Sequence, residues 1–183
     1  MKVLVLLSGG LDSATALAWA KQYSECSAIG FDYGQAHLIE LDRARRIADH
    51  FGVPFEIVAL PIMPRINDVV FAGRNLVMAA VAIAEAQARG IRSIVLGCNM
   101  SDWARFPDCR PPFWRGVADA AEVYGIQVST PLLHKTKREV VEEAQKLDVP
   151  VDLTWSCYSP RGSEPCGECL ACTVRQDAIT CSA

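Results

Sequence analysis

A glycine turn near the start of the chain has the composition of a phosphate-binding loop. It runs from Ser8 to Ser13 as SGGLDS and follows a short apolar segment. Gly9 and Gly10 let the backbone approach a phosphate closely, and the N–H groups that begin a following helix favour an anion. The carboxylate of Asp12 suits either a divalent cation beside the phosphates or a cap on the helix. The stretch predicts a polyphosphate site, with a plain strand-to-helix turn as the alternative.

Four cysteines in the last quarter of the chain have the spacing of a metal site. The spacing is C-x8-C-x2-C-x2-C, formed by Cys157, Cys166, Cys169 and Cys172. Four thiolates close a tetrahedral structural zinc site, and the ion would fold a tail that has little core of its own. An iron–sulfur cluster and a redox pair remain the alternatives. Cys181 lies outside the spacing and is expected to be a free thiol.

Five further residues are candidates for contacts with ligands. Arg74 precedes an apolar helix, where it could reach a phosphate or cap the helix. Lys137 begins a helix, and the positive end of the helix dipole disfavours a cation there unless the cation binds an anion. Asp108 and Arg110 could clamp a planar heteroaromatic ring and its carboxylate, or could pair with each other in a solvated loop. Trp155 could stack on an aromatic ring or pack within the cysteine lobe.

The elements that must position these residues alternate between strand and helix. Apolar runs predict strands at residues 3–7, 26–32, 55–60, 93–97 and 127–130. Periodicity and caps predict helices at residues 11–23, 38–51, 75–89, 113–124 and 136–147, a short helix near Ala171, and a loop at 61–72. The alternation predicts an α/β fold with an open parallel five-stranded sheet and helices on both faces, a Rossmann-like arrangement. Sites in such sheets lie at the carboxyl ends of the strands.

The length of 183 residues favours one domain with a small appendage. We expect residues 1–150 to form a nucleotide-binding domain and residues 151–183 to form a zinc-binding lobe packed on it. The 18 basic and 21 acidic residues give a net charge of −3, which offers no general attraction to nucleic acid or membrane. The apolar runs are too short for a transmembrane helix or a signal peptide, so a cytoplasmic location is expected.

The motifs together resemble one family, the 7-cyano-7-deazaguanine synthases or QueC family, within the N-type ATP pyrophosphatase (PP-loop) superfamily. The matching motifs, in chain order, are SGGLDS at 8–13, FDYGQAH at 31–37, GRN at 73–75, FPDCRPPF at 106–113, PLLHKTKREVV at 131–141 and LTWSCY at 153–158. The four-cysteine tail comes last. The resemblance implies an adenine nucleotide alpha hydrolase-like fold for the sheet domain.

The resemblance also implies a reaction: ATP and Mg²⁺ would adenylate 7-carboxy-7-deazaguanine, ammonia would give the amide, and a second adenylation would give the nitrile. By position, the nucleotide would bind at Leu7, Ser8, Gly9, Gly10, Leu11, Asp12, Ser13, Ala14, Thr15 and Arg74. The catalytic residues would be Ser8, Asp12, Ser13 and Lys137. The substrate contacts would be Asp108, Arg110 and Trp155, and Zn²⁺ would be held by the four tail cysteines. Partners would be small molecules rather than nucleic acid, and a homodimer is left open.

Several other functions remain open at this point. The segments 61–73 and 113–131 are short for the family, and Trp103 and Ala104 stand where the family often has Tyr and Ser. The reaction could therefore stop at the amide, or the pocket could bind another acceptor substrate. Another adenylating enzyme, such as a tRNA thiolase, would favour a basic surface and a catalytic cysteine pair. A non-enzymatic zinc-ribbon binding module would need basic residues around the cysteines. Between the first and last of these cysteines there is one arginine, Arg161, against the acidic residues Glu164 and Glu168.

Overall fold

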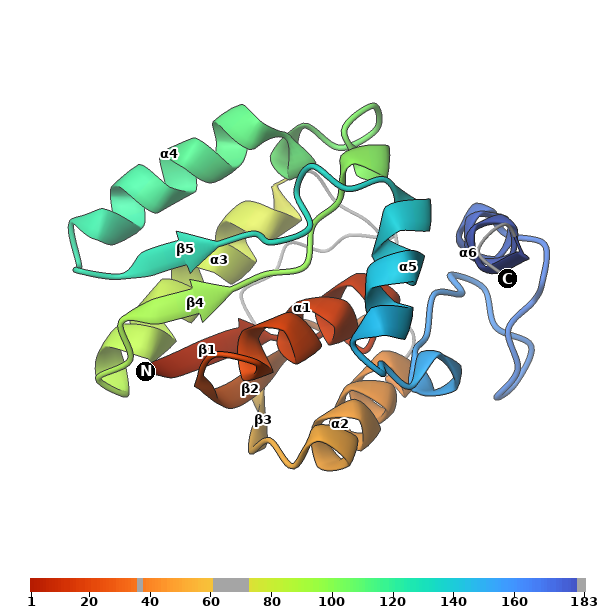
Figure 1. Cartoon of the computed structure of the whole chain (residues 1–183), viewed down its shortest axis with the longest axis horizontal. Coiled ribbons are helices and arrows are strands. Elements are labelled where there is room, and N and C mark those ends of the chain that lie inside the picture. The colour runs from red at the N-terminus through yellow and green to blue at the C-terminus, as the bar shows by residue number, and fades with distance from the viewer. Residues whose placement is uncertain (36–37, 61–72, 181–183) are drawn as a thin grey trace.

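A computed structural model of the chain describes residues 1–35, 38–60 and 73–180. The predicted loop at residues 61–72 and Cys181 lie outside this described part. The predicted parallel sheet is confirmed, with the strand order β3-β2-β1-β4-β5 (Figure 1). Its strands are β1 (Lys2–Leu6), β2 (Glu25–Asp32), β3 (Phe55–Ala59), β4 (Ser93–Val95) and β5 (Gln127–Ser129).

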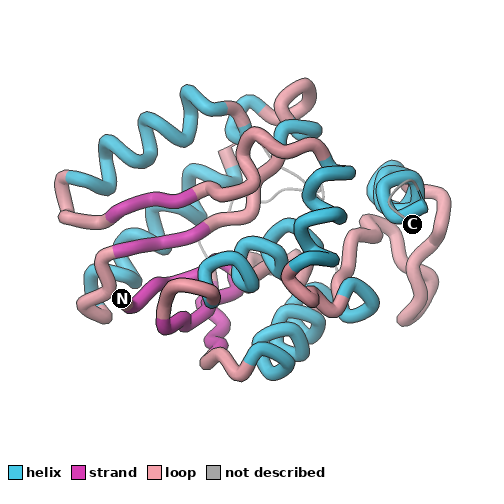
Figure 2. The backbone as a smooth tube through the Cα atoms, viewed as in Figure 1, coloured by secondary structure: helices cyan, strands magenta, loops and turns pink. Residues whose placement is uncertain are grey.

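Helices cover both faces of the sheet, because its central strands carry apolar side chains on both sides (Figure 2). In β1, Val3 and Val5 join one buried cluster, whereas Leu4 between them joins the other. The first cluster packs against α1 (Leu11–Lys21), α2 (Ile39–Phe51) and α5 (Lys137–Lys146). The second packs against α3 (Arg74–Ala88) and α4 (Pro111–Glu122).

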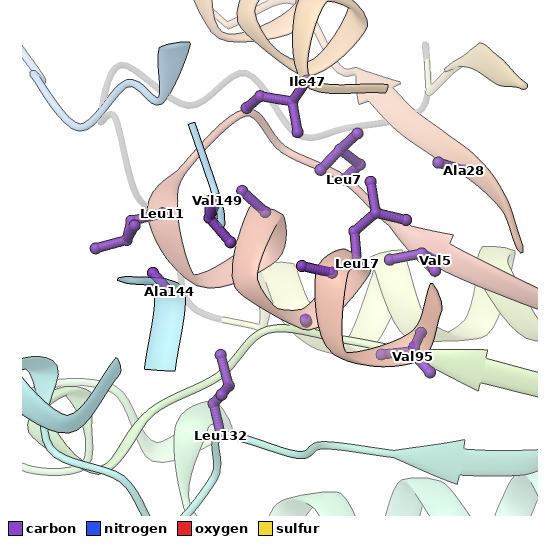
Figure 3. Packing of buried hydrophobic residues seen from close by; sticks show 14 of the residues in the cluster. Val5, Leu7, Leu11, Leu17, Ala28, Ile47, Val95, Leu132, Ala144 and Val149 are labelled. Atoms are coloured by element: carbon purple, nitrogen blue, oxygen red, sulfur yellow. The ribbon is translucent and has the colours of Figure 1, made fainter. Parts of the chain in front are cut away.

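Helix α1 lies inside the first cluster rather than on its surface (Figure 3). Leu17 packs among apolar side chains of the sheet, α2 and the segments around α5, including Val95, Ile47 and Val149. Four alanines in α1 let these neighbours come close, namely Ala14, Ala16, Ala18 and Ala20. Burial on nearly all sides fixes the N-terminus of α1 at the edge of the sheet where β1 ends.

The C-terminal tail packs on the same core. Its helix α6 (Leu170–Thr180) lies beside α5 (Figure 1), and Ala178 belongs to the buried cluster around α1. Arg175 of α6 donates to the Val151 carbonyl at 2.7 Å and to Thr154 Oγ1 at 2.6 Å. Apolar contacts therefore tie α6 to the sheet domain, whereas the Arg175 hydrogen bonds tie α6 to the segment that precedes the cysteines. No helix in the described part of the chain is long and apolar enough to cross a membrane.

The element boundaries differ from the sequence prediction mainly at the prolines. Helix α4 begins at Pro111 instead of residue 113, because proline fits the first turn of a helix, where its missing N–H is not needed. Helix α6 has 11 residues, longer than the predicted short helix near Ala171. The predicted capping box of α5 is confirmed, since Thr136 accepts from the Glu139 N–H and the Glu139 carboxylate accepts from the Thr136 N–H.

Two glycines permit the backbone to crowd around the start of α1. Gly9 has a φ of +86°, and a Cβ there would collide with the Glu40 carbonyl oxygen of α2. At Gly97, after β4, a Cβ would lie 2.5 Å from the carbonyl carbon and oxygen of Asp12. Gly97 was not singled out from the sequence, because its close neighbour lies in a distant segment. Both positions require glycine for the SGGLDS turn to sit between β4 and α2.

Replacing Gly97 by alanine should displace the start of α1. We expect Gly97→Ala to lower the free energy of unfolding by about 1–3 kcal/mol, the usual cost of overpacking a rigid backbone contact. Gly116→Ala is the matched control, since Gly116 lies within α4 and an added Cβ meets nothing within 4 Å. The free energy of unfolding of Gly116→Ala should rise by about 0.5–1 kcal/mol, because alanine has a higher helix propensity than glycine. Urea denaturation measures both values, and equal stability of the two variants would contradict the predicted contact.

Candidate nucleotide-binding site and cysteine cluster

A cavity of about 700 Å³ opens at the carboxyl ends of the central strands, as predicted for a parallel sheet. The SGGLDS turn forms one wall, and the end of β2 and the start of α3 form others. The segment after β4, Lys137 of α5, residues 155–158 and the first turns of α6 complete the lining. Segments from nearly the whole chain therefore meet at one cavity.

The turn itself is held by its serines. Ser13 Oγ donates to the Gly10 carbonyl at 2.9 Å and accepts from the Ser8 N–H at 3.2 Å. The Ser8 hydroxyl donates to Ser13 Oγ at 3.1 Å. The N-cap position of α1 is Gly10, which supplies no side-chain cap. The first N–H groups of a helix have no intrahelical partners, so this uncapped helix start at the cavity wall suits an anion.

Asp12 does not cap the helix, although the sequence left that role open. Its carboxylate pairs with Lys137 Nζ, at 2.7 Å to Oδ1 and 2.9 Å to Oδ2. The amide of Asn99 donates to Asp12 Oδ2 at 3.0 Å and to Asp102 Oδ2 at 2.8 Å. Four polar side chains from α1, α5 and the segment after β4 thus form one network beside the phosphate turn.

Asn99 is the residue in this network that the sequence analysis missed. It is 1% exposed and joins two carboxylates through one NH₂ group, while its Oδ1 accepts from the Ser101 N–H at 2.8 Å. Burial raises the pKa of Asp102, and the nearby negative charge of Asp12 raises it further. The only sequence signal for Asn99 was a polar residue shortly after the predicted strand 93–97. Its partner Asp12 lies 87 positions away in the sequence.

Arg74, the first residue of α3, and Asp108, which contacts the first turn of α3, both line the cavity. Arg74 lines the cavity, and its buried Nε has no hydrogen-bond partner among the described residues. Asp108 Oδ2 accepts from the Asn75 N–H at 3.2 Å, and Asn75 Nδ2 donates to the Asp108 carbonyl at 3.1 Å. Asp108 therefore ties its loop to the first turn of α3 and also faces the cavity.

The structure does not bring every predicted residue to the cavity. Arg110 is exposed and outside the lining, because its Nε donates to the Trp103 carbonyl at 2.7 Å. It is not the partner of Asp108 that the sequence suggested. Three predicted nucleotide contacts, Gly9, Ala14 and Thr15, are buried behind the lining. Leu7, Ser8, Gly10, Leu11, Asp12, Ser13, Arg74, Lys137, Asp108 and Trp155 all line the cavity.

Trp155 joins the phosphate turn to the cysteine lobe. Its backbone N–H donates to the Gly9 carbonyl at 2.8 Å, and its indole Nε1 donates to the Cys157 carbonyl at 3.0 Å. The ring is 5% exposed and carries the Arg43 guanidinium 5.6 Å from its centroid. Trp155 packs with the cysteines, as one sequence alternative predicted, and it also lines the cavity, while its stacking on a ligand ring stays a prediction.

The four tail cysteines converge on one point. Their sulfur atoms all lie within 4.8 Å of one another, with 3.5 Å between Cys157 and Cys166 and 4.0 Å between Cys166 and Cys172. Tetrahedral zinc with bonds of about 2.3 Å places its sulfurs about 3.8 Å apart. Backbone N–H groups of Cys166 and Ser159 donate to Cys157 Sγ, and that of Cys169 donates to Cys166 Sγ. The cluster fits a single tetrahedral metal ion.

The fold and the site define an α/β protein with an open parallel sheet, an uncapped helix start at the wall of a cavity, and a cysteine cluster that could hold a metal ion. The profile of the family described as "Queuosine biosynthesis protein QueC" matches residues 2–71 and 64–182. The chain belongs to the QueC family.

Curated relatives agree with this assignment over nearly the whole chain. A 7-cyano-7-deazaguanine synthase of a Synechococcus species is 38% identical over 207 aligned positions, which cover 96% of this chain and 91% of the relative. The synthase of Leptospira interrogans is 35% identical, and the alignment covers 96% of this chain and 85% of that synthase. An alignment of 207 positions exceeds the 183 residues of this chain, so that relative contains insertions, in keeping with the short segments noted in the sequence.

Solved structures show the same fold at low sequence identity. The U34-tRNA thiolase NcsA from Methanococcus maripaludis, solved with its [4Fe-4S] cluster, has a TM-score of 0.63 at 18% identity. The match covers 99% of this chain and 64% of the thiolase. NMN synthetase from Francisella tularensis has a TM-score of 0.62 at 18% identity, and the match covers 98% of this chain and 76% of the synthetase. At this identity the similarity concerns the fold alone.

Asp102→Asn should remove a pH-dependent cost of folding. Because the pKa of Asp102 is raised in the folded protein, the folded state binds its proton more tightly than the unfolded state does. The free energy of unfolding therefore falls as the pH rises from the usual value of 3.8 through the raised one. Asparagine can still accept from Asn99 and carries no charge.

Urea denaturation between about pH 3.5 and pH 7 tests this prediction. The stability of Asp102→Asn relative to wild type should improve with rising pH. Asp119→Asn, on the exposed side of α4, controls for the loss of one negative charge. A stability of Asp102→Asn relative to wild type that stayed constant or decreased with rising pH would contradict the prediction.

Proposed function

We propose that the chain is an ATP-dependent C–N ligase that makes 7-cyano-7-deazaguanine from 7-carboxy-7-deazaguanine and ammonia. The observation that carries the proposal is the cavity of this QueC-family member, where Lys137 and Arg74 face a helix start built for polyphosphate. A carboxylate is a poor electrophile at its carbon atom. An enzyme with a polyphosphate cradle can activate it by transferring AMP to the carboxylate oxygen and releasing pyrophosphate.

The proposed reaction uses two molecules of ATP. The substrate carboxylate oxygen attacks the α-phosphorus of the first ATP, and the bond to pyrophosphate breaks. Ammonia then attacks the acyl carbon, AMP leaves, and one proton is released to form the amide. In the second half, the amide oxygen attacks the α-phosphorus of another ATP and pyrophosphate leaves. Loss of AMP and of both protons on the amide nitrogen then leaves the C≡N bond.

The chain's own residues supply binding, orientation and charge for these steps. The Ser8 and Ser13 hydroxyls and the start of α1 lie where the β- and γ-phosphates would rest. Lys137 is held by Asp12 at the cavity wall and would stabilise negative charge on the departing pyrophosphate. Asp108 and Trp155 would bound the space for the deazaguanine ring. Arg110 is not assigned to this contact.

Two metal ions belong to the proposal. Mg²⁺ bound to the phosphates would neutralise charge on the leaving group, and the carboxylates of Asp12 and Asp102 offer the oxygen ligands that it prefers. Zn²⁺ would be held by the four tail cysteines in a structural role. An iron–sulfur cluster contains several irons and sulfides and needs a wider cage than four sulfurs within 4.8 Å. The described cysteines are free of disulfides, in keeping with a cytoplasmic location.

The tRNA thiolase alternative gains one observation, since Cys98 and Cys109 both line the cavity. A thiolase would need a reactive thiolate among them. Burial raises the pKa of Cys98 well above its usual value and that of Cys109 to about 12, so both are neutral thiols at pH 7. Together with the net charge of −3, this weighs against sulfur transfer to RNA.

The direct test is an incubation of the purified protein with 7-carboxy-7-deazaguanine, ATP, Mg²⁺ and ammonium, followed by mass spectrometry. We expect the nitrile and two AMP for each product. Lys137→Ala should lower kcat/KM about a hundredfold or more, the usual cost of removing a charge that stabilises a transition state. Lys146→Ala, at the exposed end of the same helix, should leave it unchanged.

The other outcomes separate the alternatives. An amide that accumulates would mean that the pocket performs only the first half of the reaction. AMP without either product would retain adenylation and require another acceptor. If no AMP forms, the ligase proposal fails and a zinc-binding module without catalysis becomes the better hypothesis.

The metal content of the tail gives an independent prediction. The purified protein should hold about one zinc per chain by elemental analysis, and Cys166→Ser should lose it, because three thiolates leave the tetrahedron open. Cys98→Ser should retain zinc, since Cys98 lies outside the cluster. Removal of the metal should lower the melting temperature, because binding stabilises only the folded tail. Iron with visible absorbance would refute the zinc assignment.

A further inference from the structure

We propose that the Tyr158 hydroxyl donates a hydrogen bond to the polyphosphate of the bound nucleotide, with the cysteine cluster holding Tyr158 in place. The inference rests on the proposed use of ATP and adds a contact from the tail. Tyr158 lies in the segment that runs from the phosphate turn into the cysteine cluster, and it lines the cavity. None of the residues singled out in the sequence as ligand contacts includes it.

The backbone on both sides of Tyr158 is fixed. On one side, the Trp155 N–H donates to Gly9 of the phosphate turn at 2.8 Å. On the other side, the Ser159 N–H donates to Cys157 Sγ at 3.4 Å, and a backbone hydrogen bond from Tyr158 itself acts on Cys169. Tyr158 is therefore anchored to the cysteines by its main chain, while its half-buried ring faces the cavity.

Tyr158 shares the cavity with charged groups of the site. Two cations, Arg74 of α3 and Lys137 of α5, line the same cavity, as do the carboxylate residues Asp102 and Glu40. These four groups come from four different segments around the cavity. No hydrogen bond among the described residues uses the Tyr158 hydroxyl, so its donor remains available to a ligand.

The arrangement favours a polyphosphate over a smaller anion. Lys137 stands beside Asp12 at the phosphate turn, whereas Arg74 stands at the start of α3 with its Nε unpartnered. A ligand that serves both cations must carry anionic oxygens along its length. The phosphate chain of ATP does so, whereas a single carboxylate does not. Tyr158 lines the same cavity as both cations, so its phenol can donate to an anionic oxygen of that chain.

Calorimetric titration with the α,β-methylene analogue of ATP, in the presence of Mg²⁺, tests the contact. We expect Tyr158→Phe to raise the Kd about tenfold to a hundredfold, the usual effect of losing one hydrogen bond to a charged group. Adenosine, which has no phosphates, should bind the variant and the wild type equally. Tyr124→Phe is the matched control, because Tyr124 is exposed and does not line the cavity.

Metal content and melting temperature should be the same for Tyr158→Phe and wild type, which separates a lost contact from an unfolded tail. An unchanged Kd for the analogue would overturn the proposal. Equal weakening of adenosine and of the analogue would also overturn it, because the effect of the hydroxyl would then not depend on the phosphates. The titration needs no acceptor substrate. A protein that fails to make the nitrile but shows the phosphate-specific loss would refute the proposed reaction and retain this contact.

Discussion

The close backbone approach at the phosphate turn is the constraint on which the rest of the site depends. Gly9 lies against the Glu40 carbonyl of α2, and Gly97 lies against the backbone of Asp12. A side chain at either position would push α1 away from the sheet. Because α1 is buried on nearly all sides, its position is also set by the core around Leu17 (Figure 3). The uncapped helix start is thus presented to the cavity by packing rather than by local propensity.

Charge at this helix start is balanced by an ion pair. Lys137 is paired with Asp12, and both groups line the cavity. Asn99 holds Asp12 and Asp102 together through one neutral amide, which avoids direct contact between two carboxylates. Burial of Asp102 costs free energy in its charged form, and a bound cation would offset that cost.

The cysteine lobe has a role in the site beyond folding its own short tail. Through Trp155 it contacts the phosphate turn, and through Tyr158 it supplies part of the cavity wall. Helix α6 extends the same wall and packs on the core shared by α1 and α5. The tail therefore forms part of the cavity wall, and its cysteine cluster is joined to the wall residues through backbone hydrogen bonds.

The sequence by itself determined the strand and helix alternation, the parallel sheet, the phosphate turn and the cysteine spacing, because each depends on local pattern or short range. It determined the family through motifs in order. Only the tertiary structure decided which residues meet. Asp12 and Lys137 lie 125 positions apart, and their pairing follows from the parallel sheet bringing both segments to one edge. The same reason explains why Asn99 and Gly97 gave no clear sequence signal. Arg110, plausible by composition, lies outside the cavity lining and donates to the Trp103 carbonyl.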